Sequence, residues 1–391
     1  MIILDLDVKR HEARVSDASS VGQLVNGCYG EMVKGTIHLT PEEALYLMDI
    51  RNARAFDEKL NEYSFNQVAG LFKVPKLIPR YLTYKDWRDR GLIARNFRDL
   101  ARLNERFNKD VVANYPHSEF QPKQFSVDGM FFKDSLMSVI DEENAGRELY
   151  NTYWIGQYGT YKADARGKLL KLDVYETLFL LRHFNFKLVN SDEKEVLATA
   201  RGHNKDFPSL YDVYEDWRLR NFILKTGFKF GTHFRVYFPG ASPAKSGTDW
   251  MHSKHVIHVF PRKSKLLISE WARAIRVAHS VRKTFILAIP GEKAKGEKEV
   301  SELDFLLYHR RKEGIETPRE GKPKYLMFSL SEEEFIGGAE LANAIEFCKK
   351  AGLGLMLAIA DRETSVTYYL VRRIDLKGSK YGYYEIGWYQ P

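Results

Sequence analysis

The sequence repeats itself over segments about 130 residues apart, and this internal similarity limits the possible folds more than any other feature. Residues 35–47 resemble residues 167–180. Each segment reads as a strand, an N-cap (Thr40 or Asp173) and an amphipathic helix. Three matched pairs have an identical spacing along the chain: Leu39 and Leu172, Glu43 and Glu176, and Leu45 and Leu178.

A second pair of segments lies further along, at nearly the same separation. Residues 84–90 match residues 214–220, and both carry Asp-Trp-Arg at their centre. Each reads as the end of a helix, followed by a turn and an apolar strand at Leu92-Ile93 or Phe222-Ile223. The two helix–turn–strand segments therefore extend the repeat beyond the first pair.

A third similarity lies nearer the C-terminus. Residues 305–311 resemble residues 367–373, because both are apolar stretches that end in two arginines. Leu287-Ala-Ile289 likewise resembles Leu357-Ala-Ile359. The pairs predict one complete unit, about 149–312, with a copy of its front before it and a copy of its back after it.

The repeats predict an α/β chain in which mixed α+β units follow one another in tandem. The chain divides into five predicted segments. The segment that joins the first copy to the complete unit begins with a charged stretch from Arg95 to Asn114. This stretch reads as a helix and is followed by a loop. The predicted segments are a partial N-terminal unit (1–93), a helical and loop connector (94–148), the N-terminal domain of the complete unit (149–205), the remaining domain of that unit (206–312) and a partial structural C-terminal unit (313–391).

Composition favours a soluble protein with an anionic partner. The chain has 60 Lys and Arg against 52 Asp and Glu, a formal net charge of +8, which suits binding to nucleic acid. Only two cysteines are present, so a disulfide framework is excluded. With no visible signal peptide and no apolar run long enough to span a bilayer, we expect a cytoplasmic protein without a membrane partner.

The richest stretch for chemistry runs from Trp217 to Lys283. In the strand from His233 to Phe238, apolar residues alternate with polar ones, so Tyr237 and Arg235 share the face opposite the core. After a loop rich in Gly, Pro and Ser, His252 enters a second strand. Lys283 ends a helix that leads into a third strand.

Four pieces of this stretch resemble the archaeal tRNA-intron endonuclease family. They are Lys225-Thr-Gly-Phe-Lys-Phe-Gly231, Phe234-Arg-Val-Tyr237, His252-Ser-Lys254 and Ala278-His-Ser-Val-Arg-Lys283. The resemblance implies the N-terminal and catalytic domains of that family, and the repeats extend it over nearly the whole chain. It places the family's catalytic Tyr, His and Lys on Tyr237, His252 and Lys283. The resemblance therefore implies that 206–312 is the catalytic domain and that the N-terminal unit 1–93 is non-catalytic.

The implied activity is excision of introns from precursor tRNA by cuts at both boundaries, within a bulge-helix-bulge. A 2′-OH attacks the neighbouring phosphate and leaves 2′,3′-cyclic phosphate and 5′-OH ends, without metal or other cofactor. Such a step needs a base, an acid and a cation for the crowded phosphorane, roles that the resemblance gives to Tyr237, His252 and Lys283. A free tyrosine has a pKa of about 10, so its role as the base requires cations nearby.

Two other interpretations compete with this one. His252, His255 and His258 could suggest a metal site, but their spacing puts His255 on the opposite strand face from the other two. Alternatively, the chain could be a non-catalytic RNA-binding or structural subunit of a heteromeric endonuclease. That interpretation would require a broken trio, and the trio here is complete.

The resemblance also implies that two arginines stack on an extruded bulge base. Arg276 matches the first, since it lies seven residues, or two helical turns, before Lys283. The second falls in the pair Arg310 and Arg311, with the pair Arg372 and Arg373 as the alternative. These residues are candidates for binding rather than cutting.

A loop before the second copy of the first repeat is longer than its counterpart. Gly30 to Gly35 spans five positions, whereas Gly159 to Gly167 spans eight, and the extra length brings Lys162 and Arg166 as candidate RNA contacts.

The loop that carries Asp361 and Glu363 resembles the acidic loop by which family members dock on a partner. Because one trio must make two cuts, we expect a homodimer with these residues at the contact.

Overall fold

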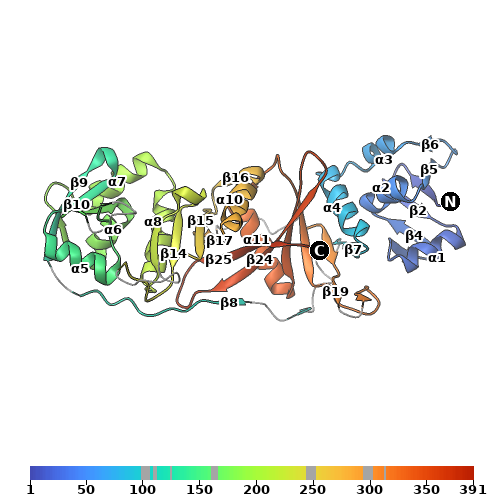
Figure 1. Cartoon of the computed structure of the whole chain (residues 1–391). Helices are drawn as coiled ribbons and strands as arrows, with labels where there is room; N and C mark the ends of the chain where they lie inside the picture. Colours follow the sequence, from blue (N-terminus) through green and yellow to red (C-terminus); the bar gives the residue numbers. More distant parts are fainter. Residues whose placement is uncertain are drawn as a thin grey trace.

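The computed structural model describes residues 1–97, 106–108, 112–123, 126–159, 166–243, 252–293, 303–311 and 314–391. Helices and strands are mixed along the chain, which confirms the predicted mixed α/β class. Figure 1 shows an elongated molecule, with a small sheet at each end and a long sheet between them. The longest described helix has 14 residues, and none of the described helices could span a bilayer.

The N-terminal sheet has six strands in the order β3-β4-β2-β1-β5-β6. Helices α2 and α4 pack on each other beside it. Its strands are β1 (Ile3–Asp7), β2 (Glu12–Val15), β3 (Glu31–Val33), β4 (Thr36–Leu39), β5 (Arg54–Asp57) and β6 (Glu62–Tyr63), with helices α1 (Ala18–Asn26), α2 (Pro41–Ile50), α3 (Phe65–Phe72) and α4 (Leu77–Asp89).

The sheet at the other end has four strands in the order β11-β10-β9-β12. Its elements are β9 (Ser126–Phe132), η2 (Lys133–Ser135), β10 (Met137–Ile140), α5 (Glu143–Tyr153), β11 (Leu170–Asp173), α6 (Val174–His183), β12 (Asn185–Leu188) and α7 (Glu193–His203), followed by α8 (Phe207–Arg218). Thr40 caps α2 and Asp173 caps α6, each in a reciprocal capping box with the glutamate three residues on. Both predicted N-caps are therefore confirmed.

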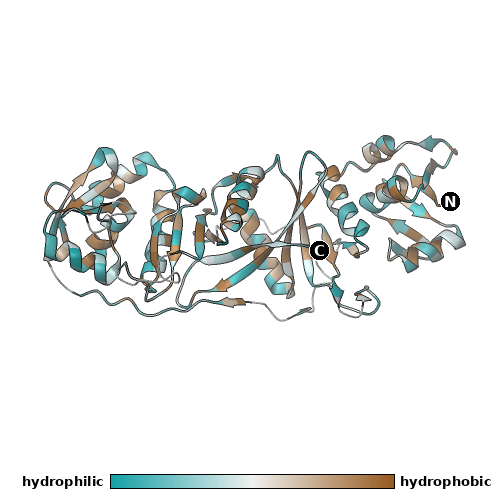
Figure 2. Cartoon of the chain, in the orientation of Figure 1, coloured by the Kyte–Doolittle hydropathy of each residue, from teal (hydrophilic) through white to brown (hydrophobic). Residues whose placement is uncertain are grey.

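The central sheet has eleven strands, ordered β13-β14-β15-β17-β25-β24-β23-β21-β18-β7, with β8 beside β24. The strands are β7 (Ala94–Asn96), β8 (Val112–Asn114), β13 (Ile223–Thr226), β14 (Phe234–Tyr237), β15 (His255–Val259), β17 (Thr284–Ile289), β18 (Phe305–Leu307), β21 (Tyr325–Ser331), β23 (Gly354–Ala360), β24 (Val366–Asp375) and β25 (Gly382–Tyr389). In Figure 2, apolar residues recur along these strands and on the helices packed against them.

Shorter elements complete the centre of the molecule. Helices α10 and α11 bury their apolar faces in one shared core with β15, β17, β21 and β23. These elements are η3 (Phe228–Phe230), β16 (Lys265–Leu267), α10 (Ile268–Ser280), β19 (Arg310–Arg311), β20 (Gly314–Ile315), β22 (Phe335–Gly337) and α11 (Gly338–Ala351). β16 pairs with β22 and β19 pairs with β20.

The central sheet consists of two equivalent halves. The inner half contains β13, β14, β15 and β17, completed by β25. The composite half contains β7, β18, β21 and β23, completed by β24. In the inner half His255 pairs with Thr284 along parallel strands, and in the composite half Tyr325 pairs with Gly354 in the same way. Leu287 lies three residues after Thr284, and Leu357 lies three residues after Gly354. The register therefore confirms the predicted match of Leu287 with Leu357.

The composite half is built from separate parts of the chain. β18 lies within the segment 206–312 that is predicted as one domain, yet its hydrogen-bonded neighbours are β7 and β21. At the other end of the inner half, β25 from the C-terminus pairs with β17. The predicted domain boundaries remain predictions, and the strand pairing joins the segment 206–312 both to the connector and to the C-terminal unit.

Two expectations about the central sheet are wrong. The similarity of 305–311 to 367–373 is not a structural equivalence, because β18 takes the position of β14 while β24 takes that of β25. The helix expected from Arg95 to Asn114 is absent at both ends, where β7 and β8 are strands, and part of the segment between lies outside the described residues. In each case backbone pairing with distant strands decides the outcome, and local sequence does not encode it.

Candidate active site

Three strands of the inner half bring the predicted trio to one edge of the central sheet. Tyr237 is the last residue of β14, and Lys283 immediately precedes β17. β15 lies between them: the residue before Tyr237 pairs with His255, and His255 pairs with the residue after Lys283. Tyr237 and Lys283 therefore lie at the same edge on either side of the start of β15, where His252 is three residues before the strand.

Lys283 holds the segment that carries His252. Its Nζ donates hydrogen bonds to the carbonyl oxygen of Ser253 and, at 3.0 Å, to the Ser253 Oγ. Ser253 is buried, whereas the neighbouring His252 is exposed. The arrangement leaves the imidazole of His252 open to a substrate next to a fixed cation.

A second cation, Arg235, lies near both Tyr237 and Lys283. The guanidinium carbon of Arg235 is 6.0 Å from the centre of the Tyr237 ring, as expected for residues on one strand face. Burial, and then the charge of Arg235, lower the pKa of Lys283. The Nζ of Lys283 also lies 4.9 Å from the ring centre of Phe230 in η3. This edge is therefore electropositive, the environment that a reaction at a phosphate requires.

Tyr237 is largely enclosed by its own protein, with only 6% of its surface exposed. Ile223 and Ala241 pack with it, and the ring of Trp154 lies 4.7 Å away, centre to centre, at 45°. Trp154 comes from the turn after α5, in the preceding domain. Sequence reasoning missed Trp154, because nothing local to residue 154 indicates its distant neighbour.

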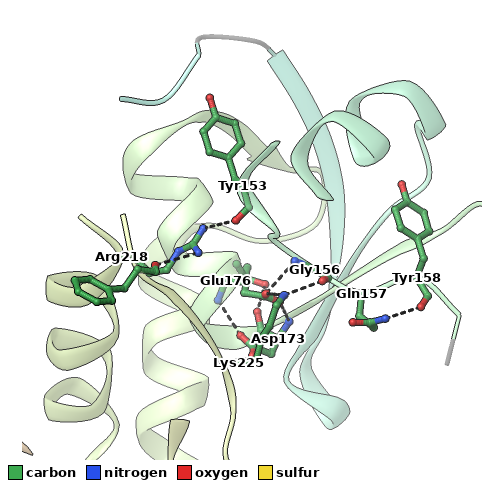
Figure 3. Close-up of polar contacts among 10 residues, drawn as sticks. Tyr153, Gly156, Gln157, Tyr158, Asp173, Glu176, Arg218 and Lys225 are labelled. Atoms are coloured by element: carbon green, nitrogen blue, oxygen red, sulfur yellow. Dashed lines mark hydrogen bonds and ion pairs between the residues drawn. The ribbon is translucent and has the colours of Figure 1, made fainter. Parts of the chain in front are cut away.

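A buried polar cluster joins the domain of α6 to the inner half of the sheet (Figure 3). Lys225 of β13 donates from its Nζ to Glu176 Oε1 at 2.7 Å and to the carbonyl oxygen of Gly156 at 2.8 Å. Glu176 Oε1 also accepts the backbone N–H of Gly156 at 2.9 Å. Burial lowers the pKa of Lys225 and, together with Glu176, raises the pKa of Asp173 to about 7.

The same geometry corrects the glycine match made from the sequence. Gly30 donates its N–H to Glu43 Oε1 at 2.9 Å, so the counterpart of Gly30 is Gly156, three residues before the expected Gly159. Of the two candidate RNA contacts in the following loop, Arg166 is exposed and Lys162 lies outside the described residues.

The composite half holds a partial counterpart of the trio. Because β18 is equivalent to β14, Tyr308 takes the position of Tyr237. Three residues before β21 stands Lys322 instead of a histidine, and immediately before β23 stands Leu353 instead of a lysine. The counterpart was hidden because β18 precedes the segment assigned to the terminal unit.

Arg276 lies on the exposed side of α10 and reaches the composite half. Its guanidinium lies near the hydroxyl of Tyr369 in β24, and its charge partly offsets the burial that raises the pKa of Tyr369. Arg310 is exposed and donates to the carbonyl oxygen of Arg90 at 3.3 Å, at the end of α4.

The structure does not bring Arg276 and Arg310 together within one chain, because four strands separate β18 from β17. Arg311 lies in β19, and its side chain is not described. The alternative pair lies on β24, where Arg372 is 3.4 Å from Glu385 and Arg373 is 3.8 Å from Asp375.

The turn between β23 and β24 carries the two acidic residues expected at a contact. Asp361 Oδ1 accepts the backbone N–H groups of Glu363 and Ser365, each at 2.9 Å, so it shapes the turn. Glu363 is exposed. The two carboxylates therefore differ: one stabilises the turn, and the other is available to a partner.

The histidines of the competing metal interpretation pack against different neighbours. His255 stacks on Phe238 at 4.8 Å, whereas His258 lies 4.7 Å from His233. Burial lowers the pKa of His255 to about 4 and that of His258 to about 3. Within the described ranges, no three His, Cys, Asp or Glu side chains converge as metal ligands would.

Comparison with known proteins gives matches over both kinds of domain. Residues 7–53 match the family model of the tRNA intron endonuclease N-terminal domain, and residues 207–300 match that of the catalytic C-terminal domain. A tRNA-splicing endonuclease of Methanococcoides burtonii is 26% identical over 332 residues, 68% of this chain and 89% of the relative. That of Thermococcus kodakarensis is 32% identical over 157 residues, 39% and 84% of the two chains.

Proposed function

Because this chain belongs to the tRNA intron endonuclease family, we propose that it is a tRNA-splicing endoribonuclease that cuts both intron boundaries in precursor tRNA. The substrate feature is a bulge-helix-bulge. The products carry 2′,3′-cyclic phosphate and 5′-OH ends, and the reaction needs no metal ion. The observation that carries the proposal is the meeting of Tyr237, Lys283 and the segment of His252 at one sheet edge.

The chemistry divides among the three side chains. Tyr237 accepts the proton of the attacking 2′-OH, and His252 donates a proton to the leaving 5′-oxygen. Lys283 stabilises the extra negative charge that develops on the phosphorane. Arg235, near the Tyr237 ring, favours the ionised phenol and so supports the role of Tyr237 as the base.

Binding is the proposed role of residues around this edge. Arg276 stacks on an extruded bulge base, and the second arginine is Arg310 or Arg311. Their separation within one chain fits a dimer in which the second arginine comes from the partner copy. Lys162 and Arg166 contact phosphates, while Asp361 and Glu363 lie near the contact between the two copies.

The decisive experiment incubates the purified chain alone, in EDTA, with an intron-containing precursor. The expected result is two cuts and products with cyclic phosphate ends. Tyr237→Phe, His252→Ala and Lys283→Ala should each lower the single-turnover rate about 10² to 10⁴-fold while RNA binding stays close to wild type. Binding without cleavage would instead identify a non-catalytic subunit, and near wild-type rates in two of the three variants would refute the trio.

A further inference from the structure

A short segment between two domains is clamped from both sides in the inner half. It runs from Tyr153 to Gly156. Arg218 donates to the carbonyl oxygen of Tyr153 at 3.0 Å, and Lys225 donates to that of Gly156 at 2.8 Å. Glu176 accepts the N–H of Gly156 at 2.9 Å. Figure 3 shows the two cations reaching the segment from the neighbouring domain.

The composite half contains the same clamp, made by a different stretch of chain. Its segment runs from Gly27 to Gly30. Arg88 donates to the carbonyl oxygen of Gly27 at 2.7 Å, and Arg95 donates to that of Gly30 at 2.6 Å. Glu43 accepts the N–H of Gly30 at 2.9 Å. Arg88 corresponds to Arg218, and Arg95 corresponds to Lys225. The sequence separation within each pair equals that between the matched segments 84–90 and 214–220, so the clamp belongs to the repeated unit.

The two clamped segments differ in the residue that they present to the tyrosine. The second residue of each has a left-handed backbone: Trp154 with φ 47° and Cys28 with φ 57°. Trp154 packs on Tyr237 at 4.7 Å, and Cys28 packs in a cluster with Tyr308. In the half with the complete trio, the large ring of Trp154 therefore faces Tyr237. In the half without it, the small side chain of Cys28 faces Tyr308.

We propose that Trp154 is a positioning residue for Tyr237, an inference that rests on the proposed function. The indole ring takes no part in proton transfer. It limits the movement of the phenol and so keeps the hydroxyl where the 2′-OH must deliver its proton. Displacements of about 1 Å at a reacting group can lower a rate about 10²-fold, so a gap beside the phenol has a measurable cost. A cysteine at the same position offers the tyrosine a smaller contact surface.

Neighbouring residues fix the indole itself. Ile155, the next residue, is fully buried, and both ends of the segment are hydrogen bonded to the clamp. Gly156 has φ 78°, and a Cβ there would lie 2.5 Å from Leu170, so this end of the segment is closely packed and requires glycine. The clamp thus fixes the position of Trp154 beside Tyr237.

The experiment compares Trp154→Ala, Trp154→Phe and the matched variant Cys28→Ala in the full chain. Cleavage is measured as a single-turnover rate at saturating enzyme. Affinity is measured with a precursor that carries 2′-deoxyribose at both cleavage sites and cannot react. We expect Trp154→Ala to lower the rate about 10- to 100-fold with affinity within about twofold. Trp154→Phe should stay within about threefold, and Cys28→Ala should match wild type.

A double-mutant cycle separates positioning from a general loss of structure. If Trp154 acts through the phenol hydroxyl, Trp154→Ala should cause no further loss in a Tyr237→Phe background. A wild-type rate for Trp154→Ala would overturn the inference. So would a full additional loss in the Tyr237→Phe background, or weaker binding of the unreactive precursor at an unchanged rate, which would indicate stacking of Trp154 on RNA.

The inference and the proposed function fail in distinguishable ways. If Tyr237→Phe cleaves at the wild-type rate, the role of Tyr237 as the base is wrong, whatever Trp154 does. If Tyr237→Phe abolishes cleavage and Trp154→Ala does not change it, only the positioning role is wrong. Thermal unfolding of every variant reports the folded fraction by which each rate is corrected.

Discussion

Tyr308 holds in the composite half the position that Tyr237 holds in the inner half. Each packs with an isoleucine at or just before the start of the neighbouring strand, and each has 6% of its surface exposed. The tyrosines differ in their surroundings, because Lys322 and Leu353 stand where the inner half has its histidine and lysine.

We therefore expect Tyr308→Phe to cleave precursor at the wild-type rate, whereas Tyr237→Phe should lose about 10²-fold or more. Parallel single-turnover assays check this, and equal losses in both variants would show that the composite half takes part in catalysis.

Arg276 should bind RNA through its planar guanidinium rather than its charge alone. Both Arg276→Ala and Arg276→Lys should weaken binding of a bulged RNA about tenfold, since stacking on a base contributes about 1–3 kcal/mol. Tyr369→Phe is the matched control, because it removes the hydroxyl near Arg276 and keeps the guanidinium. The measurement is a titration with unreactive precursor. Full affinity in Arg276→Lys would reduce its role to electrostatics.

Glu363 should contribute to assembly without shaping its own turn. Glu363→Gln should raise the dissociation constant of the dimer about tenfold or more, because a charge at an interface loses its partner. Asp361→Ala should act additionally on the turn, where two backbone N–H groups lose their acceptor. Light scattering over a dilution series measures the effect, with exposed Glu58→Gln as the control. An unchanged dimer, or an active monomer that makes both cuts, would contradict the prediction.

The loop before Gly167 should matter most for irregular substrates. Lys162→Ala combined with Arg166→Ala should slow cleavage of a precursor with an irregular bulge more than that of a regular one. The difference should shrink at high salt, because phosphate contacts are electrostatic. The measurement uses both substrates at two salt concentrations, with exposed Lys205→Ala as the control. Wild-type rates throughout would leave the loop without a role in binding.

Stability should fall in mild acid because His233 must stay neutral. Its Nδ1 accepts the N–H of Val259 at 2.9 Å, and burial lowers its folded-state pKa to about 4 from about 6.5. His258 packs on it, and Asp206 is the nearby charge that opposes the shift. Between pH 6.5 and 4 the unfolded chain binds more protons, so stability is lost as the pH falls, by about 3 kcal/mol for this ring.

His233→Asn tests this origin of the acid sensitivity, since an amide oxygen can replace Nδ1 as the acceptor without titrating. Urea unfolding of the variant at pH 7 and pH 4.5 should show a smaller difference than wild type. An identical pH dependence in the two proteins would assign the acid sensitivity to other groups.

Much of the fold followed from sequence because its signals are local. Thr40 and Asp173 indicate where two helices start, because each side chain accepts a hydrogen bond from the backbone N–H only three residues further on. The trio was identified for a related reason: each of its residues lies in a short motif that resembles a known family. Alternation along 233–238 also placed Tyr237 and Arg235 on one strand face.

The tertiary structure decided which distant segments meet. A three-residue strand such as β18 pairs through backbone N–H and C=O groups. Almost every residue carries these groups, so the sequence of β18 does not specify β7 and β21 as its partners. For the same reason Tyr308 was overlooked as a counterpart of Tyr237. Trp154 and Tyr237 are far apart in the sequence, and only the packing of two domains puts one ring on the other. Sequence thus determined the chemistry available, and the long-range packing determined which residues hold it in place.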